Sequence, residues 1–512
     1  MPDSLARFAA ITAFAFLLSR ASGLVREQVI GAQFGLGSDV DAYRLALQVP
    51  DLLFLLVSGG VLGSAFIPVF ARLRTSGKEE AAWKMASGVL GLIATSVTVL
   101  TVVAWVFAPQ LIQDGIARNA PEETQALAIG LMRIVLLQPL FLALAGVATA
   151  ILQSFDRFTL PAFVPIAYNA CIILAAILLD PLIGMYGVAL GVALGGFVFF
   201  VIQLPPVIRL GLRMPTGWPL ADANVRLTFA LLVPRIVGQA ALQLNSLLAV
   251  YLALGLGSGY AAALGFAWTL FALPVGLFGT SVGTVTFPTL SRDAGETDLS
   301  RFRLLLTRAL RGVLFFVLPA SIGVILLREP IVSLVFERGA FDHEDTLLTA
   351  QPLLYTSLSM WAYALGEILP RAFYALQDTK TPVKIALSIL VLEAVLMVLL
   401  VEPLQLAGLA LAFSLATMTQ VLMLVFALQS RIGSLVDRDT FNFVMKALLA
   451  TTLMAAALWL ARPLIADYSS MSLLTKLMRV GTTVTGGAAV YVLVSIGLRQ
   501  EEVAILLRIA RR

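Results

Sequence analysis

Long apolar runs recur along the whole chain, separated by short turns that charged residues, glycine or proline mark. A helix needs about 20 consecutive apolar residues to cross the hydrocarbon core of a membrane. Apolar residues make up 59% of the 512 residues, against only 35 Lys and Arg and 30 Asp and Glu. A water-soluble fold of this length cannot bury so much apolar surface. The sequence therefore predicts an integral membrane protein with many spans.

We expect an all-α fold with fourteen transmembrane helices, because fourteen apolar segments are long enough to span. They lie near residues 5–30, 40–72, 83–108, 124–152, 160–180, 184–208, 226–254, 259–290, 304–327, 347–375, 382–401, 404–429, 441–461 and 472–498. The first run continues through Ser19 and Arg20 without a small-residue cleavage site. It is therefore expected to be a span and not a cleaved signal peptide.

Basic residues divide unevenly between the two sets of loops. One set, which includes both termini, contains 22 Lys and Arg, whereas the other contains Arg118, Arg328, Arg338, Arg462 and Lys476. Short loops rich in Lys and Arg stay on the cytoplasmic side. Both termini are therefore expected in the cytoplasm. The basic C-terminal tail is interpreted as part of this orientation signal, with contact to anionic lipids as the alternative.

Prolines and glycines near helix ends recur at a nearly constant sequence offset, which indicates an internal repeat. Three pairs share this offset to within one position, namely Pro68 with Pro288, Pro161 with Pro382, and Gly187 with Gly408. A repeat of six helices enters and leaves on one side, so the copies are related by a pseudo-two-fold axis along the membrane normal. We expect lobes at 1–220 and 221–430, followed by helices 13 and 14 and the basic tail at 431–512. Two facing lobes are typical of transporters that alternate access.

Ionisable residues within the expected spans are the candidate site residues, since each costs about 2.5 to 3.5 kcal/mol to insert. A guanidinium group binds a phosphate through two parallel hydrogen bonds. The pattern predicts an anionic, phosphorylated, amphipathic substrate. Its candidate ligands are Arg20, Arg26, Asp41, Arg44 and Arg235. The alternative for three of them, Arg26, Asp41 and Arg44, is pairing or snorkelling at the outer interface.

Other chemistry is limited by the composition. Glu393 is an isolated carboxylate in the eleventh expected helix, where it either couples transport to Na⁺ or H⁺ or is a protonated structural acid. Cys171 is the single cysteine and His343 the single histidine. We therefore expect no internal disulfide, no catalytic triad and no metal site. The net charge of +5 is modest and indicates no nucleic-acid partner.

Several stretches resemble the MurJ (MviN) lipid II flippases of the multidrug/oligosaccharidyl-lipid/polysaccharide exporter superfamily, and the resemblance covers nearly the whole chain. The most diagnostic is Phe373-Tyr374-Ala375-Leu376-Gln377-Asp378-Thr379-Lys380-Thr381-Pro382-Val383. The others are Ser19-Arg20 with Gly23 and Arg26, Asp41-Ala42-Tyr43, Pro50-Asp51-Leu52-Leu53, Ser64-Ala65-Phe66-Ile67-Pro68, Arg157-Phe158 with Pro161-Ala162-Phe163, and Arg338-Gly339-Ala340-Phe341-Asp342.

The resemblance implies a non-enzymatic flippase of the bacterial cell membrane. It would carry undecaprenyl-pyrophosphate-linked disaccharide-pentapeptide, lipid II, to the outer leaflet for peptidoglycan synthesis and so support cell wall biogenesis and cell shape. The resemblance assigns Arg20 and Arg26 to the pyrophosphate, Asp41 to the cavity mouth, and the last two helices to a groove for the lipid tail. It implies membrane potential or a Na⁺ or H⁺ gradient as the driving force, with no cofactor. We expect a monomer whose partners are lipid II and membrane lipids.

The sequence departs from the family pattern at five positions. Phe54 and Gly59 stand where an arginine and a glutamate are frequent. Thr269 stands where an arginine is common, and Trp268 and Ala272 stand in place of flanking acids. Arg235 is expected to compensate. The alternatives within transport are a flippase for another polyprenyl-linked glycan, a drug exporter of the same superfamily and a major-facilitator transporter, whose loop signature is not evident. Short loops disfavour a membrane glycosyltransferase, and arginines within spans disfavour a scaffold.

Overall fold

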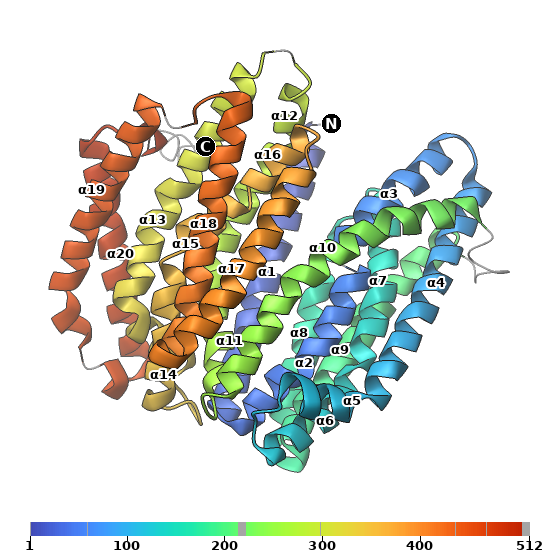
Figure 1. The fold of residues 1–512 in the computed structure, drawn as a ribbon, viewed down its shortest axis with the longest axis horizontal. Helices are drawn as coiled ribbons and strands as arrows, with labels where there is room; N and C mark the ends of the chain where they lie inside the picture. Colours follow the sequence, from blue (N-terminus) through green and yellow to red (C-terminus); the bar gives the residue numbers. More distant parts are fainter. Residues whose placement is uncertain are drawn as a thin grey trace. The chain divides into compact units, whose positions relative to one another are not determined.

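The computed structural model describes residues 2–58, 60–212, 222–296, 298–435, 437–466 and 468–503. Within these ranges, the side chains of 2–13, 16, 56–65, 229–242 and 470 lie outside the description. The described chain is built from helices joined by short turns (Figure 1). Most described residues of each expected range are helical, because an apolar run in a membrane must satisfy its backbone hydrogen bonds internally.

The helices up to residue 254 are α1 (Pro2–Phe34), α2 (Ser38–Ser58), α3 (Gly60–Thr75), α4 (Glu79–Val106), α5 (Ala108–Gln110), α6 (Glu122–Val135), α7 (Leu137–Ser154), α8 (Thr159–Ile183), α9 (Met185–Leu210) and α10 (Ala223–Leu254). The later helices are α11 (Tyr260–Val275), α12 (Ser281–Asp293), α13 (Ser300–Phe336), α14 (His343–Ser357), α15 (Met360–Gly366), α16 (Leu369–Ala375), α17 (Lys380–Leu404), α18 (Leu406–Ile432), α19 (Arg438–Leu460) and α20 (Leu473–Gly497). Shorter π-helical segments (Leu111–Ile116, Gly276–Thr280) and 3-10 segments (Arg462–Ile465, Tyr468–Ser470) interrupt them.

Length and composition identify the membrane-crossing segments. Among the described residues, ten helical segments are long and apolar enough to cross a membrane. Some of these segments comprise two shorter helices, as in α6 with α7, where the span runs over Glu122–Ser154. The all-α, multi-pass character predicted from the sequence is confirmed. The count of fourteen spans stays a prediction.

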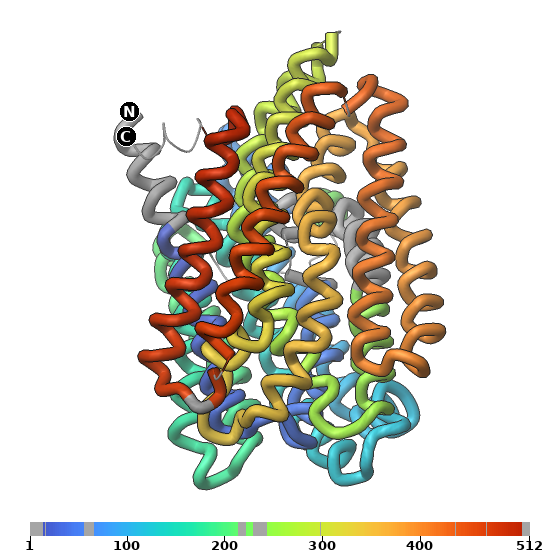
Figure 2. Tube along the Cα trace, turned by 90° about the vertical axis from the view of Figure 1, so that its left-hand side faces the viewer, coloured from blue at the N-terminus to red at the C-terminus, as the bar shows by residue number. Residues whose placement is uncertain are grey.

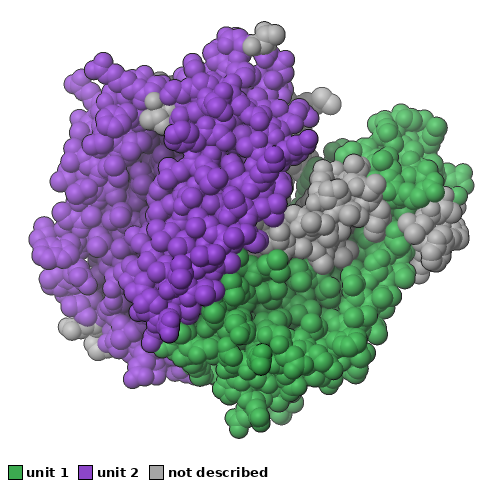
Figure 3. All heavy atoms as spheres, in the orientation of Figure 1, with its two compact units in different colours: residues 1–262 green, residues 263–512 purple. Residues whose placement is uncertain are grey.

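The chain divides into two compact units, residues 1–262 and 263–512 (Figure 3). The lobe boundary expected near residue 220 stays a prediction, but by contacts α10 belongs to the first unit because it packs on α2, α3 and α4. In that unit α8 lies along α9, α1 packs on α8, and α7 packs on α9. In the second unit α17 pairs with α18, and the hairpin of α19 and α20 packs against α13 (Figures 1 and 2).

The backbone turns repeat at the same offset as the glycines and prolines. Asp156 and Gln377, each just after a helix, both have positive φ, at 57° and 59°. Gly184 and Gln405 form the turns between α8 and α9 and between α17 and α18, with φ of 55° and 51°. The members of each pair are as far apart in sequence as Pro161 and Pro382. Non-glycine residues rarely adopt this conformation, so its recurrence at one offset supports the internal repeat.

The repeated glycines occupy equivalent close contacts. Gly187 is the third residue of α9, and a Cβ placed on it would come within 2.7 Å of Leu179 Cβ in α8. Gly408 is the third residue of α18, and a Cβ there would collide with Leu400 O in α17. In both hairpins glycine lets two helix backbones approach closely, as small residues do in membrane helix pairs.

Candidate functional site

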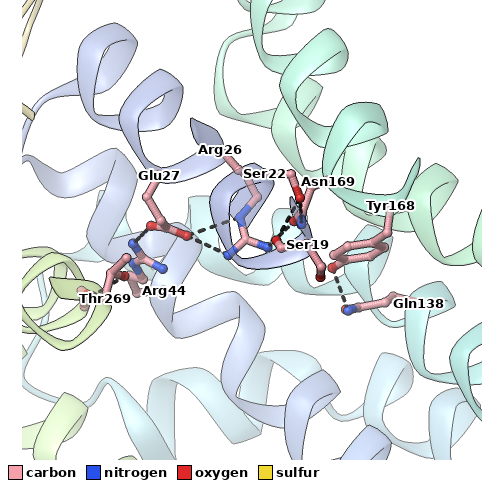
Figure 4. A network of polar contacts seen from close by, with 10 residues as sticks. Ser19, Ser22, Arg26, Glu27, Arg44, Gln138, Tyr168, Asn169 and Thr269 are labelled. Atoms are coloured by element: carbon pink, nitrogen blue, oxygen red, sulfur yellow. Dashed lines mark hydrogen bonds and ion pairs between the residues drawn. The ribbon is translucent and has the colours of Figure 1, made fainter. Parts of the chain in front are cut away.

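Two of the predicted arginines, one from each of the first two helices, converge on an acidic residue. Arg26 and Glu27 are neighbours in α1, and Arg44 lies in α2. Arg26 donates to Glu27 Oε1 from Nη2 at 2.8 Å and from Nε at 3.2 Å. Arg44 Nη2 donates to the other oxygen, Glu27 Oε2. Each carboxylate oxygen therefore pairs with a different guanidinium group (Figure 4).

The three charged side chains differ in how far they are buried. Glu27 is 2% exposed, whereas the side chains of Arg26 and Arg44 are 26% and 15% exposed. The acid is the most buried member, and the two cations retain accessible surface. Two guanidinium groups around one carboxylate carry a formal net charge of +1. An anion that reaches them meets charge and hydrogen-bond donors already held in place.

A polar chain extends from Arg26 to α8. Arg26 Nη1 donates to Asn169 Oδ1 at 3.1 Å, and Asn169 Nδ2 donates to Ser22 Oγ at 2.9 Å. Tyr168, the neighbour of Asn169, accepts a hydrogen bond on its hydroxyl from Gln138 Nε2 at 2.9 Å. The hydrogen bonds that link Arg26, Asn169 and Ser22 restrain the Arg26 guanidinium group beside Glu27 (Figure 4). They also tie α1 to α8, on which it packs.

Asp41 has a different setting from the arginines. It is 1% exposed, and its two oxygens accept hydrogen bonds from the backbone N–H of Gly259 at 2.6 Å and of Ala262 at 2.8 Å. These amides belong to the turn before α11 and to its first turn, where N–H groups lack partners within the helix. In this structure Asp41 therefore caps a helix. Its predicted role in substrate binding stays a prediction.

The other predicted site residues are more scattered. Arg20 is exposed on α1, and Glu393 is half-buried in the middle of α17. Arg235 lies within α10, but its side chain is outside the described residues. The roles predicted for these three residues stay predictions.

Among the departures from the family pattern, the structure describes the side chains of Thr269 and Phe54. Thr269 donates to Gly265 O of its own helix at 3.0 Å, and Phe54 is half-buried in α2. Gly59 is outside the described residues. Neither described side chain carries the charge that is frequent at its position.

Glu27, Asn169 and Ser22 belong to this site but are absent from the residues predicted from the sequence. Glu27 has a detectable signal, because a carboxylate next to an arginine inside an apolar run is costly unless the two pair. Asn169 has no comparable signal, since an amide in a spanning helix is common enough to pass as structural.

Comparisons with known proteins agree along nearly the whole chain. The family model described as "Lipid II flippase MurJ" matches residues 30–479. A probable lipid II flippase MurJ of Vibrio cholerae serotype O1 is 29% identical over 498 residues, covering 95% of each chain. The lipid II flippase MurJ of Burkholderia cenocepacia is 29% identical, covering 81% of this chain and 82% of its own.

Solved structures show the same fold. A lipid II flippase MurJ in an inward closed conformation matches with a TM-score of 0.81 and 26% identity, covering 96% of this chain and 99% of its own. An inward-facing multidrug resistance MATE family transporter of the MOP superfamily matches with a TM-score of 0.69 and 15% identity, covering 83% and 98%. The second likeness shows the fold alone.

Fold, site and comparisons together define a class: a multi-pass transporter of the bacterial inner membrane, and not an enzyme. The chain belongs to the lipid II flippase MurJ family.

Proposed function

We propose that this chain moves lipid II from the cytoplasmic to the outer leaflet of the bacterial inner membrane, supplying peptidoglycan synthesis. Membership of the family supports the substrate. The observation that carries the proposal for this chain is the arrangement of Arg26 and Arg44 around Glu27. A pyrophosphate has the charge and the acceptor geometry that two guanidinium forks require.

Glu27 allows the site both to bind the pyrophosphate and to release it. Without substrate, its carboxylate neutralises part of the charge on Arg26 and Arg44, which limits the cost of keeping both inside the membrane. An arriving pyrophosphate competes with Glu27 for the guanidinium hydrogens. When the pyrophosphate leaves, Glu27 pairs with both arginines again. Arg20, Asp41 and Arg235 are the further proposed contacts along the path of the headgroup.

The transport cycle we propose is alternating access in a monomer with fourteen helices and both termini in the cytoplasm. The recurrence of turns and glycines at one sequence offset supports two equivalent six-helix repeats. Membrane potential or a gradient of Na⁺ or H⁺ drives the cycle, with no cofactor, and Glu393 is the proposed coupling acid. The last two helices provide the groove for the polyprenyl tail.

Complementation tests both the substrate and the site. The chain is expressed in a bacterium depleted of its own lipid II flippase, together with Arg26→Ala, Arg26→Lys and Arg301→Gln variants. We expect rescue by the parent and by Arg301→Gln, a matched loss of one charge at an exposed position. Arg26→Ala should fail to rescue. Arg26→Lys should rescue weakly, because lysine keeps the charge but lacks the fork.

The outcomes separate two failures. If the parent fails to rescue while lipid II accumulates inside, the substrate proposal is wrong, and another polyprenyl-linked glycan or a drug becomes the candidate cargo. If the parent and Arg26→Ala rescue equally, the substrate stands and the assignment of the site is wrong. Expression of each variant in the membrane is measured alongside growth.

A further inference from the structure

Arg133 is a further arginine inside a membrane span, and it is not a member of the cluster of Arg26, Glu27 and Arg44. It belongs to α6 and is half-buried, with its guanidinium carbon 4.9 Å from the centroid of the Trp105 ring in α4. Its Nε is buried without a hydrogen-bond partner. Over the described ranges, no carboxylate pairs with Arg133. A guanidinium group whose neighbour is an aromatic ring keeps its outer N–H groups available for an anion.

The depth of Arg133 places those N–H groups near the membrane surface. The span Glu122–Ser154 has 33 residues, which is about 50 Å of helix around a hydrocarbon core about 30 Å thick. Arg133 lies eleven residues from its start, about 16 Å along the axis. With the hydrocarbon core centred on this span, that position is about 6 Å below the core boundary. An arginine side chain covers that distance by snorkelling. Trp105, next to the last residue of α4, has the position of an interfacial aromatic residue.

The surface around the pair faces lipid. Trp105 is 48% exposed, and Val102, Val103 and Val106 of the same helix are exposed to a similar degree. These side chains offer acyl chains an apolar surface directly beside a cation. The phosphate-bearing molecules at this surface are membrane lipids. A zwitterionic headgroup would bring its own ammonium group against Arg133, with no paired carboxylate there to accept it.

We propose that Arg133 and Trp105 form a binding site for the phosphodiester of an anionic glycerophospholipid, such as phosphatidylglycerol. The lipid lies in the leaflet where α4 ends and α6 begins, with its acyl chains along the exposed valines of α4. Arg133 donates to the phosphate, and the Trp105 ring holds the guanidinium group at headgroup level. This site is independent of the proposed transport function, since it involves neither Arg26 nor Arg44.

The test is native mass spectrometry of the full chain, released from detergent with phosphatidylglycerol and phosphatidylcholine at equal concentration. We expect the parent to retain phosphatidylglycerol selectively. Arg133→Gln should weaken that binding about fivefold, which corresponds to about 1 kcal/mol for one basic residue at a membrane surface. Arg118→Gln is the matched control, because it removes the same charge four residues before α6 and is exposed. Arg133→Lys should fall between the parent and Arg133→Gln.

Three results would overturn the proposal. Equal losses for Arg133→Gln and Arg118→Gln would indicate diffuse attraction by net charge. No loss in either variant would show that no headgroup binds here. Loss of binding to added undecaprenyl phosphate with phosphatidylglycerol unaffected would assign the site to another lipid. If Arg133→Gln does not fold, Trp105→Leu at the exposed surface decides instead, with an expected loss of about twofold or more.

Discussion

At the scale of single residues, the charge of Glu27 controls how strongly two half-buried arginines attract an anion. A buried carboxylate held by two guanidinium groups recovers part of the desolvation cost of all three. The same carboxylate competes with any incoming phosphate. Arg26 is further restrained by Asn169, which keeps its fork in place when Glu27 is displaced. The cluster is therefore both a structural element and a site that an anion can enter.

Glu27→Gln tests this double role. The variant leaves two guanidinium groups without their counter-ion, so we expect the free energy of unfolding to fall by about 3 kcal/mol. Inorganic pyrophosphate should restore part of the loss, because it replaces the missing negative charge. Thermal denaturation in detergent, with and without pyrophosphate, measures both effects. Glu367→Gln is the control, since its pair with Arg371 is 3.4 Å long and about 30% exposed, and it should cost less than about 1 kcal/mol.

Either of two results would contradict this reading of Glu27: an unchanged melting temperature in Glu27→Gln, or a pyrophosphate effect as large in the parent as in the variant.

Gln405 provides a residue-scale prediction from backbone geometry. Its φ is 51° and its ψ is −130°, a conformation that glycine adopts readily and other residues rarely do. Glycine occupies the equivalent turn of the first repeat, at Gly184. Gln405→Gly should therefore raise the free energy of unfolding by up to about 1 kcal/mol, measured by thermal denaturation. Gly184→Ala should lower it by a similar amount. A lower melting temperature for Gln405→Gly would show that the turn is not strained.

At the scale of helices, sequence predicts where the chain is helical and misses how the helices are interrupted. Apolar run length gives 124–152, but the structure divides this segment at Leu136 between α6 and α7. Likewise α13 continues to Phe336, beyond the expected end at 327, with non-helical dihedral angles at Leu327. Hydropathy reports burial in lipid and carries little information about individual backbone hydrogen bonds. Such interruptions depend on the neighbouring helices.

The same limit explains the partial prediction of the site. A charged residue within an apolar run stands out, so Arg26 and Arg44 are identified from the sequence. That both arginines pair with the same carboxylate is not evident from it, because a sequence does not show which face of α2 meets α1. Asp41 illustrates the converse: its charge marks it as a candidate, while its contacts with Gly259 and Ala262 depend on a helix in a distant part of the sequence.

Glu337 links three helices of the second unit and yields a prediction about pH. It follows α13, contacts Lys476 Nζ of α20 at 3.1 Å, and accepts from Thr346 Oγ1 of α14 at 2.9 Å. Burial raises the pKa of Glu337, but hydrogen bonds from Ser333, Lys476 and Thr346 outweigh it and leave the pKa below its usual value. The ionised form therefore stabilises the fold above the unfolded pKa, about 4.3, and this contribution is lost as pH falls through the lower folded value.

Comparison of the parent with Glu337→Gln isolates this contribution. The parent should melt at a higher temperature at pH 7, and the difference should shrink below about pH 4. His343 lies 3.7 Å from Glu337 Oε2 and is present in both proteins, so its direct titration affects both curves. A difference in melting temperature that is the same at pH 7 and pH 3.5 would contradict the prediction.

At the scale of the whole molecule, the sequence carries two independent signals, the repeat and the charge asymmetry. The repeat has a physical counterpart in the described residues, because the turns at Asp156 and Gln377 share one conformation at the offset of the repeat. The charge asymmetry predicts which ends of the helices face the cytoplasm. The fold by itself does not give this orientation. Division of the chain at residue 262 follows packing, whereas the lobe boundary at 220 follows the repeat, so α10 is assigned differently by the two criteria.

Orientation is best tested with cysteine accessibility, for which this chain is well suited because Cys171 is its single cysteine. In a Cys171→Ala background, Lys78→Cys and Arg118→Cys place one thiol before and one after α4, both at exposed positions. Arg438→Cys, at the first residue of α19, and Arg462→Cys, just after that helix, mark its two ends at exposed positions. The bias of Lys and Arg predicts that a membrane-impermeant maleimide labels the variants at 118 and 462 in intact spheroplasts. The variants at 78 and 438 should react only after permeabilisation.

Labelling of all four in intact cells, or the opposite pattern, would contradict the cytoplasmic termini. Agreement at α4 with reversal at α19 would instead mean an odd number of missing or additional crossings between them, and the predicted count of fourteen would fail.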